Sequence, residues 1–250
     1  MIHDSSGTML YLNGVSVSFD GFRALNALSI IVHPNEMLAI IGPNGAGKTT
    51  MMDIITGKTR PDDGEVYFDG RTDLTKLDEA DIANLGIGRK FQKPTVFESH
   101  TIWDNILLAL KKPRGVFSAF SYFASGEDTA RITEILDTVR LTKRQDELAS
   151  DLSHGQKQWL EICMLLAQDP KLLLVDEPVA GMTDSETVET AKLLKEIAKT
   201  RSVVVVEHDM SFVRELGTRV TCLAEGSVLA EGTLDQVSAN PVVIERYLGR

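Results

Sequence analysis

The hydrophobic and polar positions in the first part of the chain predict two strands, a third strand and then a helix. Segments 11–19 and 27–32 are rich in apolar and β-branched residues, which is typical of two adjacent strands. A very apolar strand is predicted over 37–41, and it leads through a glycine-rich loop into a helical pattern over about 48–56. The chain is therefore expected to open with strands followed by a strand–loop–helix unit.

Two further apolar runs in the second half, 171–175 and 203–206, predict parallel strands buried on both faces. The segment 184–199 between them has apolar residues at helical spacing. One side of this helix is expected to consist of Val188, Ala191, Leu194 and Ile197. This order of elements predicts a right-handed crossover between neighbouring parallel strands.

The middle of the chain, about 94–165, differs because it has several helical patterns and no strong strand pattern. Thr101 and Asp104 resemble a capping box at the start of one of these helices. We expect residues 94–165 to form an all-helical insertion in a parallel α/β core that comprises 1–93 and 166–250.

Composition narrows the possible functions. The 250 residues are 43% hydrophobic and 25% charged, as in ordinary globular domains, and the net charge of −10 argues against a nucleic-acid partner. Cys163 and Cys222 are too few for a disulfide framework. No apolar run reaches the roughly 18–20 residues that span a bilayer, and the first residues lack the features of a signal peptide. We expect no membrane span, so that any role at a membrane depends on other subunits.

The strongest chemical signal is the segment 42–49, GPNGAGKT, which we call the phosphate loop. It fits the pattern GxxxxGK[ST] and stands between an apolar strand and a helix. Its glycines let backbone N–H groups turn toward phosphates beside the positive end of the helix. Lys48 is expected to reach the β- and γ-phosphates, and the Thr49 hydroxyl to bind Mg²⁺. The alternative is a glycine-rich turn that only caps a helix.

A second signal is the pair of acids Asp176 and Glu177, which follow the buried run 172–175. Parallel strands end at the edge of a sheet where ligands bind, so the pair is expected beside the phosphate loop. Asp176 is expected to hold Mg²⁺ through water, and Glu177 to orient and polarise the attacking water. Paired acids after a strand are also common caps of helices, so the pair alone leaves both interpretations open.

The segment 152–156, LSHGQ, opens a helix that continues to Ala167, and here the sequence resembles the ATP-binding-cassette (ABC) ATPases. We call 152–156 the signature segment, because the family usually has LSGGQ there. Phe19 resembles the family's aromatic that stacks on adenine, Gln92 its glutamine loop and His208 its switch histidine. Without the resemblance, Phe19 would more often be a core residue, and His208 could merely cap the next turn.

The resemblance covers nearly the whole chain and implies an ATPase that uses ATP and Mg²⁺. It implies an α/β fold: a P-loop NTPase core of mostly parallel sheet, an N-terminal antiparallel β subdomain and an inserted helical signature subdomain. The nucleotide contacts it implies are Phe19, Gly42, Pro43, Asn44, Gly45, Ala46, Gly47, Lys48, Thr49, Thr50, Ser153, Gly155 and Gln156. It assigns catalysis to Glu177, His208, Gln92 and Lys48. It assigns Mg²⁺ to Thr49, Gln92 and Asp176.

Two positions depart from the family pattern. His154 replaces the middle glycine of the signature, and a histidine there costs stability if the backbone needs a positive φ. Ser153 and Gly155, the implied γ-phosphate contacts, are retained, so we expect function to survive. Thr183 stands where the family usually has Asp or Asn, which weakens an interface role for that position.

The resemblance also implies partners. Family geometry places Ser153 on the opposite subunit from Lys48, so the chain should pair with itself or a sister ATPase and sandwich two ATP molecules. It would energise transmembrane permease subunits, and indirectly serve a solute-binding protein, as a peripheral subunit on the cytoplasmic face of the plasma (inner) membrane. A surface groove near 92–105 is expected to contact the permease. The aromatic run 117–123 is either core filling or a contact with a membrane partner.

The expected cargo rests on a finer resemblance. The segment LSHGQKQWLEI, with His154 and Trp159, is similar to one of the two ATPase subunits of urea importers within the branched-chain amino-acid importer family. Urea is therefore the expected cargo, and branched-chain amino acids are the alternative. A rival from another class is a cytosolic ATP-gated clamp on DNA, but the chain has no heptad run for long coiled-coil arms.

Overall fold

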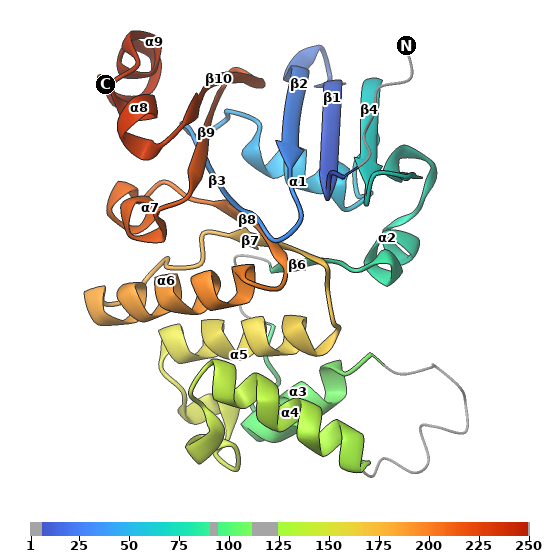
Figure 1. The fold of residues 1–250 in the computed structure, drawn as a ribbon, viewed down its shortest axis with the longest axis vertical. Helices are drawn as coiled ribbons and strands as arrows, with labels where there is room; N and C mark the ends of the chain where they lie inside the picture. The colour runs from blue at the N-terminus through green and yellow to red at the C-terminus, as the bar shows by residue number, and fades with distance from the viewer. Residues whose placement is uncertain (1–6, 91–94, 112–124, 250) are drawn as a thin grey trace.

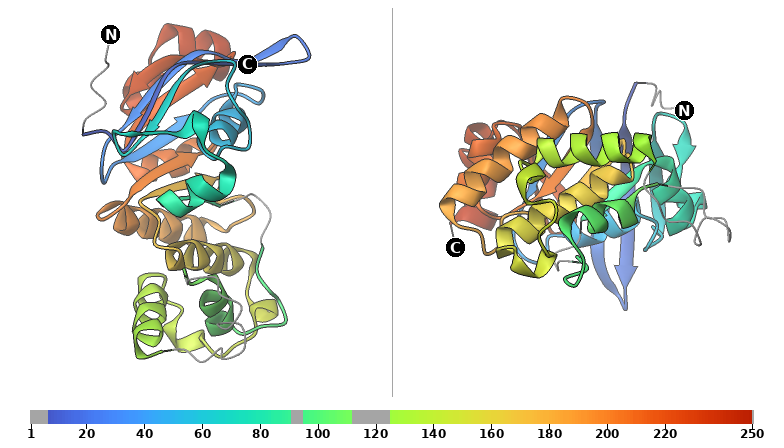
Figure 2. Two further views of the ribbon diagram at one scale, coloured as in Figure 1. Left: turned by 90° about the vertical axis from the view of Figure 1, so that its right-hand side faces the viewer. Right: turned by 90° about the horizontal axis from the view of Figure 1, so that it is seen from below.

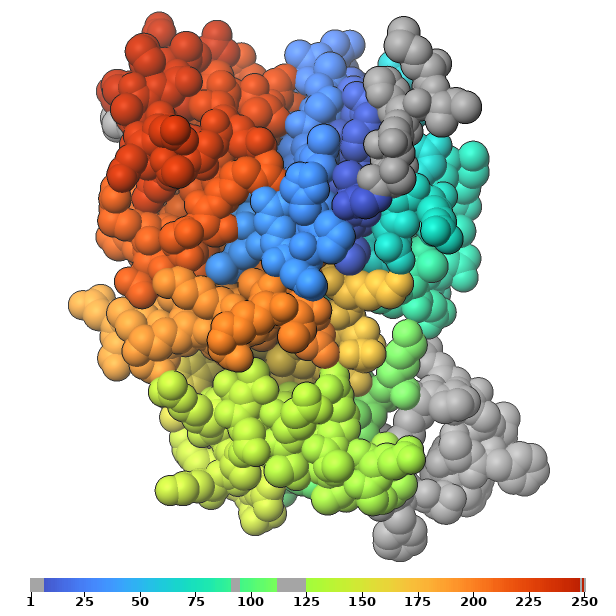
Figure 3. All heavy atoms as spheres, in the orientation of Figure 1, coloured from blue at the N-terminus to red at the C-terminus, as the bar shows by residue number. Residues whose placement is uncertain are grey.

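Two β-sheets and a group of helices build the chain, and the computed structural model describes residues 7–90, 95–111 and 125–249. The sheets lie in the upper part of Figure 1 and the helices α3, α4 and α5 in the lower part. The left view in Figure 2 and the space-filling view in Figure 3 show the same division along the long axis.

The smaller sheet is antiparallel and has the strand order β2–β1–β4–β5. β1 (Leu10–Phe19) pairs with β2 (Phe22–Val32) and β4 (Asp63–Phe68), and β5 (Thr72–Asp73) pairs with β4. β2 is longer at its start than the apolar pattern predicts. Ala27 has a positive φ of 49°, and register shifts between β1 and β2 interrupt the alternation of apolar residues.

The larger sheet has the order β10–β9–β3–β8–β7–β6. Its central strands are β3 (Met37–Ile41), β8 (Ser202–Val206) and β7 (Leu172–Asp176), which run parallel to one another. Every residue of these strands is buried, so the prediction of strands covered on both faces is confirmed.

The sequence analysis did not predict three outer strands of this sheet, and two of them, β6 and β10, carry no clear signal in the sequence. β6 (Ile87–Lys90) pairs in parallel with β7, while β9 (Arg219–Ala224) joins β3 and β10 (Ser227–Gly232) closes the edge in antiparallel orientation. β6 is short and contains two basic residues, and no residue of β10 is fully buried. Strands of this kind lack the apolar runs and the alternation that reveal a strand.

Helices cover both faces of the larger sheet. α1 (Lys48–Ile55) packs on the face that carries Leu174, and α5 (His154–Ala167) and α6 (Asp184–Ala198) pack on the face that carries Leu173. The shorter helices are α2 (Glu79–Leu85), α7 (Met210–Leu216), α8 (Leu234–Ser238) and α9 (Pro241–Val243). None of the described helices has the length and apolar character needed to cross a bilayer.

α6 connects the neighbouring parallel strands β7 and β8, as the predicted crossover requires. Ala191, Leu194 and Ile197 are buried as expected, but Val188 is 39% exposed. The prediction for Val188 is wrong because residues spaced three apart drift by about 60° per step around a helix of 3.6 residues per turn. Over the row from Val188 to Ile197 the drift reaches about half a turn.

Between β6 and β7 the described chain contains α3 (Ile102–Ala109), α4 (Gly126–Thr138) and α5. The Thr101 side chain accepts a hydrogen bond from the backbone N–H of Asp104 and caps α3. The three helices share one apolar cluster with β7 and β8, in which Leu136 and Leu160 belong to the same packed group as Val203. The helical part therefore packs directly onto the sheet.

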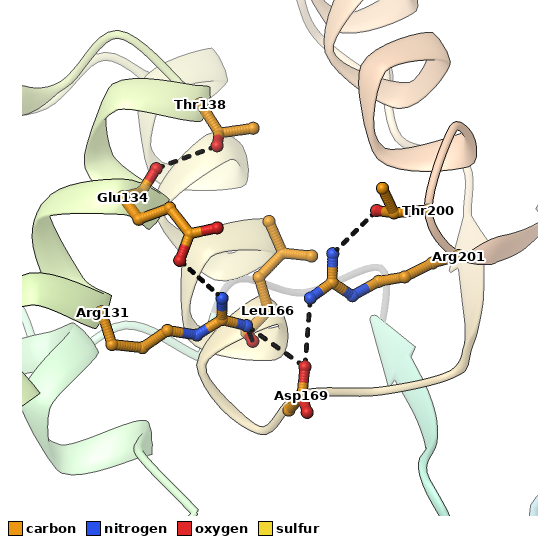
Figure 4. A network of polar contacts seen from close by, with 7 residues as sticks. All are labelled: Arg131, Glu134, Thr138, Leu166, Asp169, Thr200 and Arg201. Carbon is orange, nitrogen blue, oxygen red and sulfur yellow. Dashed lines mark hydrogen bonds and ion pairs between the residues drawn. The ribbon is translucent and has the colours of Figure 1, made fainter. Parts of the chain in front are cut away.

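One carboxylate also links the helical part to the loops around the sheet (Figure 4). Oδ1 of Asp169, in the turn after α5, lies 3.2 Å from Nη2 of Arg131 on α4 and 3.1 Å from Nη2 of Arg201 before β8. Arg131 also pairs with Glu134 at 2.9 Å and donates to the carbonyl of Leu166. These contacts join the helical part to the loops around the sheet. They add little stability, because the Asp169 side chain is 72% exposed.

Candidate active site

The phosphate loop connects the buried strand β3 to the first turn of α1, where the sequence predicts it. Gly42, Gly45 and Gly47 have positive φ values of 148°, 80° and 97°. A Cβ on Gly47 would lie 2.6 Å from Cδ2 of Leu25 and 2.7 Å from the carbonyl oxygen of Ala24. Glycine is thus required both by the backbone conformation and by the close approach of the neighbouring chain.

Lys48 lies half-buried at the start of α1, and its ammonium donates to the carbonyls of Gly42 at 2.6 Å and Pro43 at 2.9 Å. Burial lowers the pKa of Lys48, and the nearby carboxylates of Glu177 and Asp176 oppose this shift. The other predicted contacts of this region occupy the same loop and turn: Asn44, Gly45, Ala46, Gly47, Thr49 and Thr50. A cation beside a glycine loop at a helix N-terminus fits a phosphate ligand.

Asp176 ends β7, and Glu177 follows it with a positive φ of 45°. The backbone N–H of Glu177 donates to the carbonyl of Val206 at 2.9 Å, which ties the acid pair to the end of β8. Asp176 is 5% exposed, and burial raises the pKa of its carboxyl against the opposing charge of Arg89. Both acids act electrostatically on Lys48, so the structure brings the predicted acids and the phosphate loop together.

Arg89 on β6 is a residue that the sequence pattern does not single out. Its Nη1 lies 2.5 Å from Oδ1 of Asp53 on α1, and its Nη2 lies 3.6 Å from Oδ2 of Asp176. The side chain is almost fully buried, so it joins the helix behind the phosphate loop to the acid at the end of β7. In the sequence, the only signal is the pair of basic residues Arg89 and Lys90 after an apolar position. This pattern predicts no functional role for Arg89, because that role depends on which strands lie next to β6.

His208 follows β8, and its Nδ1 lies 3.6 Å from Oε1 of Glu177. Its neighbour Glu207 is 1% exposed, and Oε2 of Glu207 accepts the backbone N–H groups of His208 at 2.8 Å and Asp209 at 3.2 Å. Burial raises the pKa of Glu207. The structure thus places the His208 ring beside the Glu177 carboxylate, and Glu207, which the sequence analysis missed, holds the backbone of that turn.

The signature segment forms the N-terminus of α5. Ser153 is the N-cap and exchanges capping-box hydrogen bonds with Gln156. His154 is the first helical residue and does not have a positive φ, so the condition under which a histidine would cost stability here is not met. Its Nε2 lies 3.1 Å from the carbonyl oxygen of Ala180, in the loop after Glu177.

The remaining predicted residues lie elsewhere. α5 and α1 pack on opposite faces of the larger sheet, so the signature segment is not on the sheet face that α1 covers. Phe19 ends β1 and is 46% exposed. Thr183 is the N-cap of α6 and shares a capping box with Glu186. Gln92 and the aromatic run 117–123 lie outside the described residues.

The sequence profile of the family described as "ABC transporter" matches residues 25–180. The chain belongs to the ABC transporter family. The cassette is 33% identical over 253 residues to the high-affinity branched-chain amino acid transport ATP-binding protein LivG of Escherichia coli K12, covering 98% of this chain and 99% of LivG. It is 32% identical over 253 residues to the corresponding protein BraF of Pseudomonas aeruginosa, with the same coverage.

Solved structures agree with this membership. The crystal structure of an ABC transporter cassette in its ADP conformation matches with a TM-score of 0.85 and 29% identity, over 97% of this chain and 99% of that chain. A dimeric bacterial ABC transporter cassette matches with a TM-score of 0.75 and 28% identity, over 90% and 99%. The predicted fold class is confirmed. The cassette is an ATPase that works on ATP with Mg²⁺.

Proposed function

We propose that this cassette is the ATPase subunit of an importer for branched-chain amino acids. The observation that supports this cargo is the match to LivG and BraF along almost their whole length, since both are named for transport of branched-chain amino acids. Those names support the alternative cargo of the sequence analysis better than urea. They also favour transport over the rival clamp on DNA.

Urea is the second candidate cargo, and it rests on the form of the signature helix. His154 and Trp159 give this helix its similarity to a urea-importer subunit, but both side chains face the loop and helix that follow β7. Nε2 of His154 meets the carbonyl of Ala180, and Nε1 of Trp159 donates to Oγ1 of Thr190 at 2.8 Å. Neither residue is placed to contact a solute, so other subunits would select the cargo.

Uptake of labelled leucine and labelled urea, measured side by side in cells that lack this cassette, tests the cargo. We expect energy-dependent leucine uptake to be lost and urea uptake to be kept. The intact chain should restore leucine uptake, and Glu177→Gln should not. Loss of urea uptake alone would overturn the amino-acid assignment and leave the ATPase role intact.

The residues around the phosphate loop support a division of labour in hydrolysis. The loop N–H groups and Lys48 would bind the phosphates and offset their charge. Three side chains would hold Mg²⁺: Thr49, Gln92 and Asp176. The bound ion neutralises charge on the phosphates. Glu177 would accept a hydrogen bond from the attacking water and orient it, and His208 would hold the carboxylate of Glu177 in position.

Two cassettes are needed to complete each site in this proposal. The phosphate loop and the signature segment are built on helices that cover opposite faces of the sheet. Ser153, Gly155 and Gln156 would therefore meet the γ-phosphate held by the partner subunit's phosphate loop, and the exposed ring of Phe19 would stack on adenine. The dimeric form of a related cassette supports this arrangement.

The segment after Gln92 offers a firm surface for a permease. Buried Asn105 accepts the backbone N–H of Phe97 at 2.7 Å and donates to the carbonyls of Phe97 at 3.0 Å and Thr101 at 2.8 Å. These hydrogen bonds hold the loop while the Phe97 ring stays half exposed. Leu148, which forms a β-bridge with Thr101, is also exposed. We assign this surface to a cytoplasmic helix of the permease, with the cassette at the cytoplasmic face of the inner membrane and the solute-binding protein reached only indirectly.

A further inference from the structure

The signature segment is tied to α6 by one carboxylate, that of Glu186. The Ser153 hydroxyl donates to Oε1 of Glu186 at 2.9 Å. Oε2 of Glu186 accepts the backbone N–H and the hydroxyl of Thr183, both at 3.0 Å. α5 and α6 lie side by side in Figure 1, and the Trp159–Thr190 hydrogen bond joins them further along.

Gly155 provides the space that this carboxylate occupies. A Cβ at position 155 would lie 2.6 Å from both Cδ and Oε1 of Glu186. The carboxylate therefore rests against the backbone of the signature segment. The hydrogen bonds from Thr183 and Ser153 hold the pKa of Glu186 below its usual value, so the group is an anion at neutral pH.

The position of the Glu186 carboxylate conflicts with the role proposed for Ser153 and Gly155. Ser153 and Gly155 are expected to meet a γ-phosphate, yet the hydroxyl of Ser153 already donates a hydrogen bond to a carboxylate. An anion beside the N-terminus of α5 also offsets the positive end of that helix, which would otherwise attract phosphate. The approaching phosphate must compete for the hydroxyl and overcome a like charge.

We propose that Glu186 is a positioning residue that holds the Ser153 hydroxyl in the open cassette and, through its charge, sets how readily ATP closes the dimer. The inference rests on the proposed dimeric function. On closure the hydroxyl keeps its proton and exchanges one acceptor, the Glu186 carboxylate, for another, a phosphate oxygen of the ATP bound by the partner subunit. The carboxylate opposes closure and favours reopening.

The test is Glu186→Gln in a Glu177→Gln background, in which we expect ATP hydrolysis to be slow enough for bound ATP to persist. Glutamine preserves the size of the side chain and the capping box with Thr183, so the helix start is kept. Glu189→Gln is the matched control: it lies one turn along the same helix, changes the net charge equally, and pairs instead with Arg140 at 2.7 Å and Lys192 at 2.8 Å. Sedimentation velocity gives the dimer fraction against ATP concentration.

We expect Glu186→Gln to lower the ATP concentration for half-maximal dimerisation about five- to tenfold at low salt, the size of effect for one nearby charge. Glu189→Gln should leave it unchanged. The gain should shrink at about 0.5 M salt, because added ions screen the charge. With Glu177 intact, Glu186→Gln should lower KM for ATP without raising kcat.

Glu186→Asp keeps the charge and should dimerise like the parent. A Glu186→Gln cassette that behaves like the Glu189→Gln control, or a gain that is independent of salt, would overturn the role of Glu186 alone. If the Glu177→Gln parent does not dimerise with ATP at all, the dimeric function and the role of Glu186 are both wrong.

Discussion

The phosphate loop and the signature segment would both meet phosphate, but the chain holds them by different means. The phosphate loop is fixed by its backbone, through glycines with positive φ and the close approach of Gly47 to Ala24. The signature segment is held by side chains, through Ser153 on Glu186 and His154 on the carbonyl of Ala180. A backbone-held site is rigid and intolerant of substitution, whereas a side-chain-held site can be adjusted while the fold is kept.

This difference suits the two tasks that we propose. A site that must bind nucleotide in every subunit benefits from a loop that is preorganised before binding. A site that must engage and release a partner's ligand benefits from contacts that can be exchanged at modest cost. The substitutions below separate the two regions, from the largest expected effect to the smallest.

The largest effect is expected on the phosphate-loop side, at Glu177. Glu177→Gln removes the carboxylate that would orient the attacking water, and we expect phosphate release to fall by about a hundredfold or more. ATP binding, measured by equilibrium dialysis, should be retained because the loop and Lys48 are unchanged. Normal phosphate release by this variant would contradict the role assigned to Glu177.

A pair of alanine substitutions compares the two regions directly. In Gly47→Ala the new Cβ meets the backbone carbonyl of Ala24, and the alanine must adopt the positive φ of this position. We therefore expect a loss of about 1–3 kcal/mol in the free energy of unfolding. In Gly155→Ala the Cβ meets only the end of the Glu186 side chain, and alanine gains up to about 1 kcal/mol of helix propensity. We therefore expect a smaller loss in the free energy of unfolding than for Gly47→Ala. Chemical denaturation of both variants measures the difference. Equal losses would show that the signature segment is as rigid as the phosphate loop.

The smallest effect is expected for His154→Gly, which restores the usual signature residue. The variant loses the contact with the carbonyl of Ala180 and places glycine in the first turn of α5. We expect the free energy of unfolding to fall by about 1 kcal/mol, with ATP hydrolysis retained. His33→Ala, at an exposed histidine, is the control and should unfold like the parent. A more stable His154→Gly variant would mean that the histidine is strained.

Much of the fold and of the phosphate-binding chemistry could be predicted because it depends on local patterns. β3 is apolar throughout, and β7 and β8 are apolar except for Asp176 and Ser202 at their ends, so their burial and parallel pairing follow from composition and order. The phosphate loop can be recognised in the sequence from its glycines and its lysine, which stand at fixed spacing. By contrast, the expectation that Val188 shares one side of α6 with Ala191, Leu194 and Ile197 is wrong, because a row spaced three apart does not show where it drifts away from the core.

The sequence by itself determined the phosphate loop, the central strands and the family, because each is encoded by residues that are neighbours in the chain. Only the tertiary structure decided which distant side chains meet. It placed Arg89 between Asp53 and Asp176, and Glu186 on Ser153. Such contacts join elements far apart in sequence, and a buried or shared carboxylate looks like any surface acid until packing sets its neighbours. The sequence therefore specified which charged and polar side chains are present, and packing decided which of them contact one another.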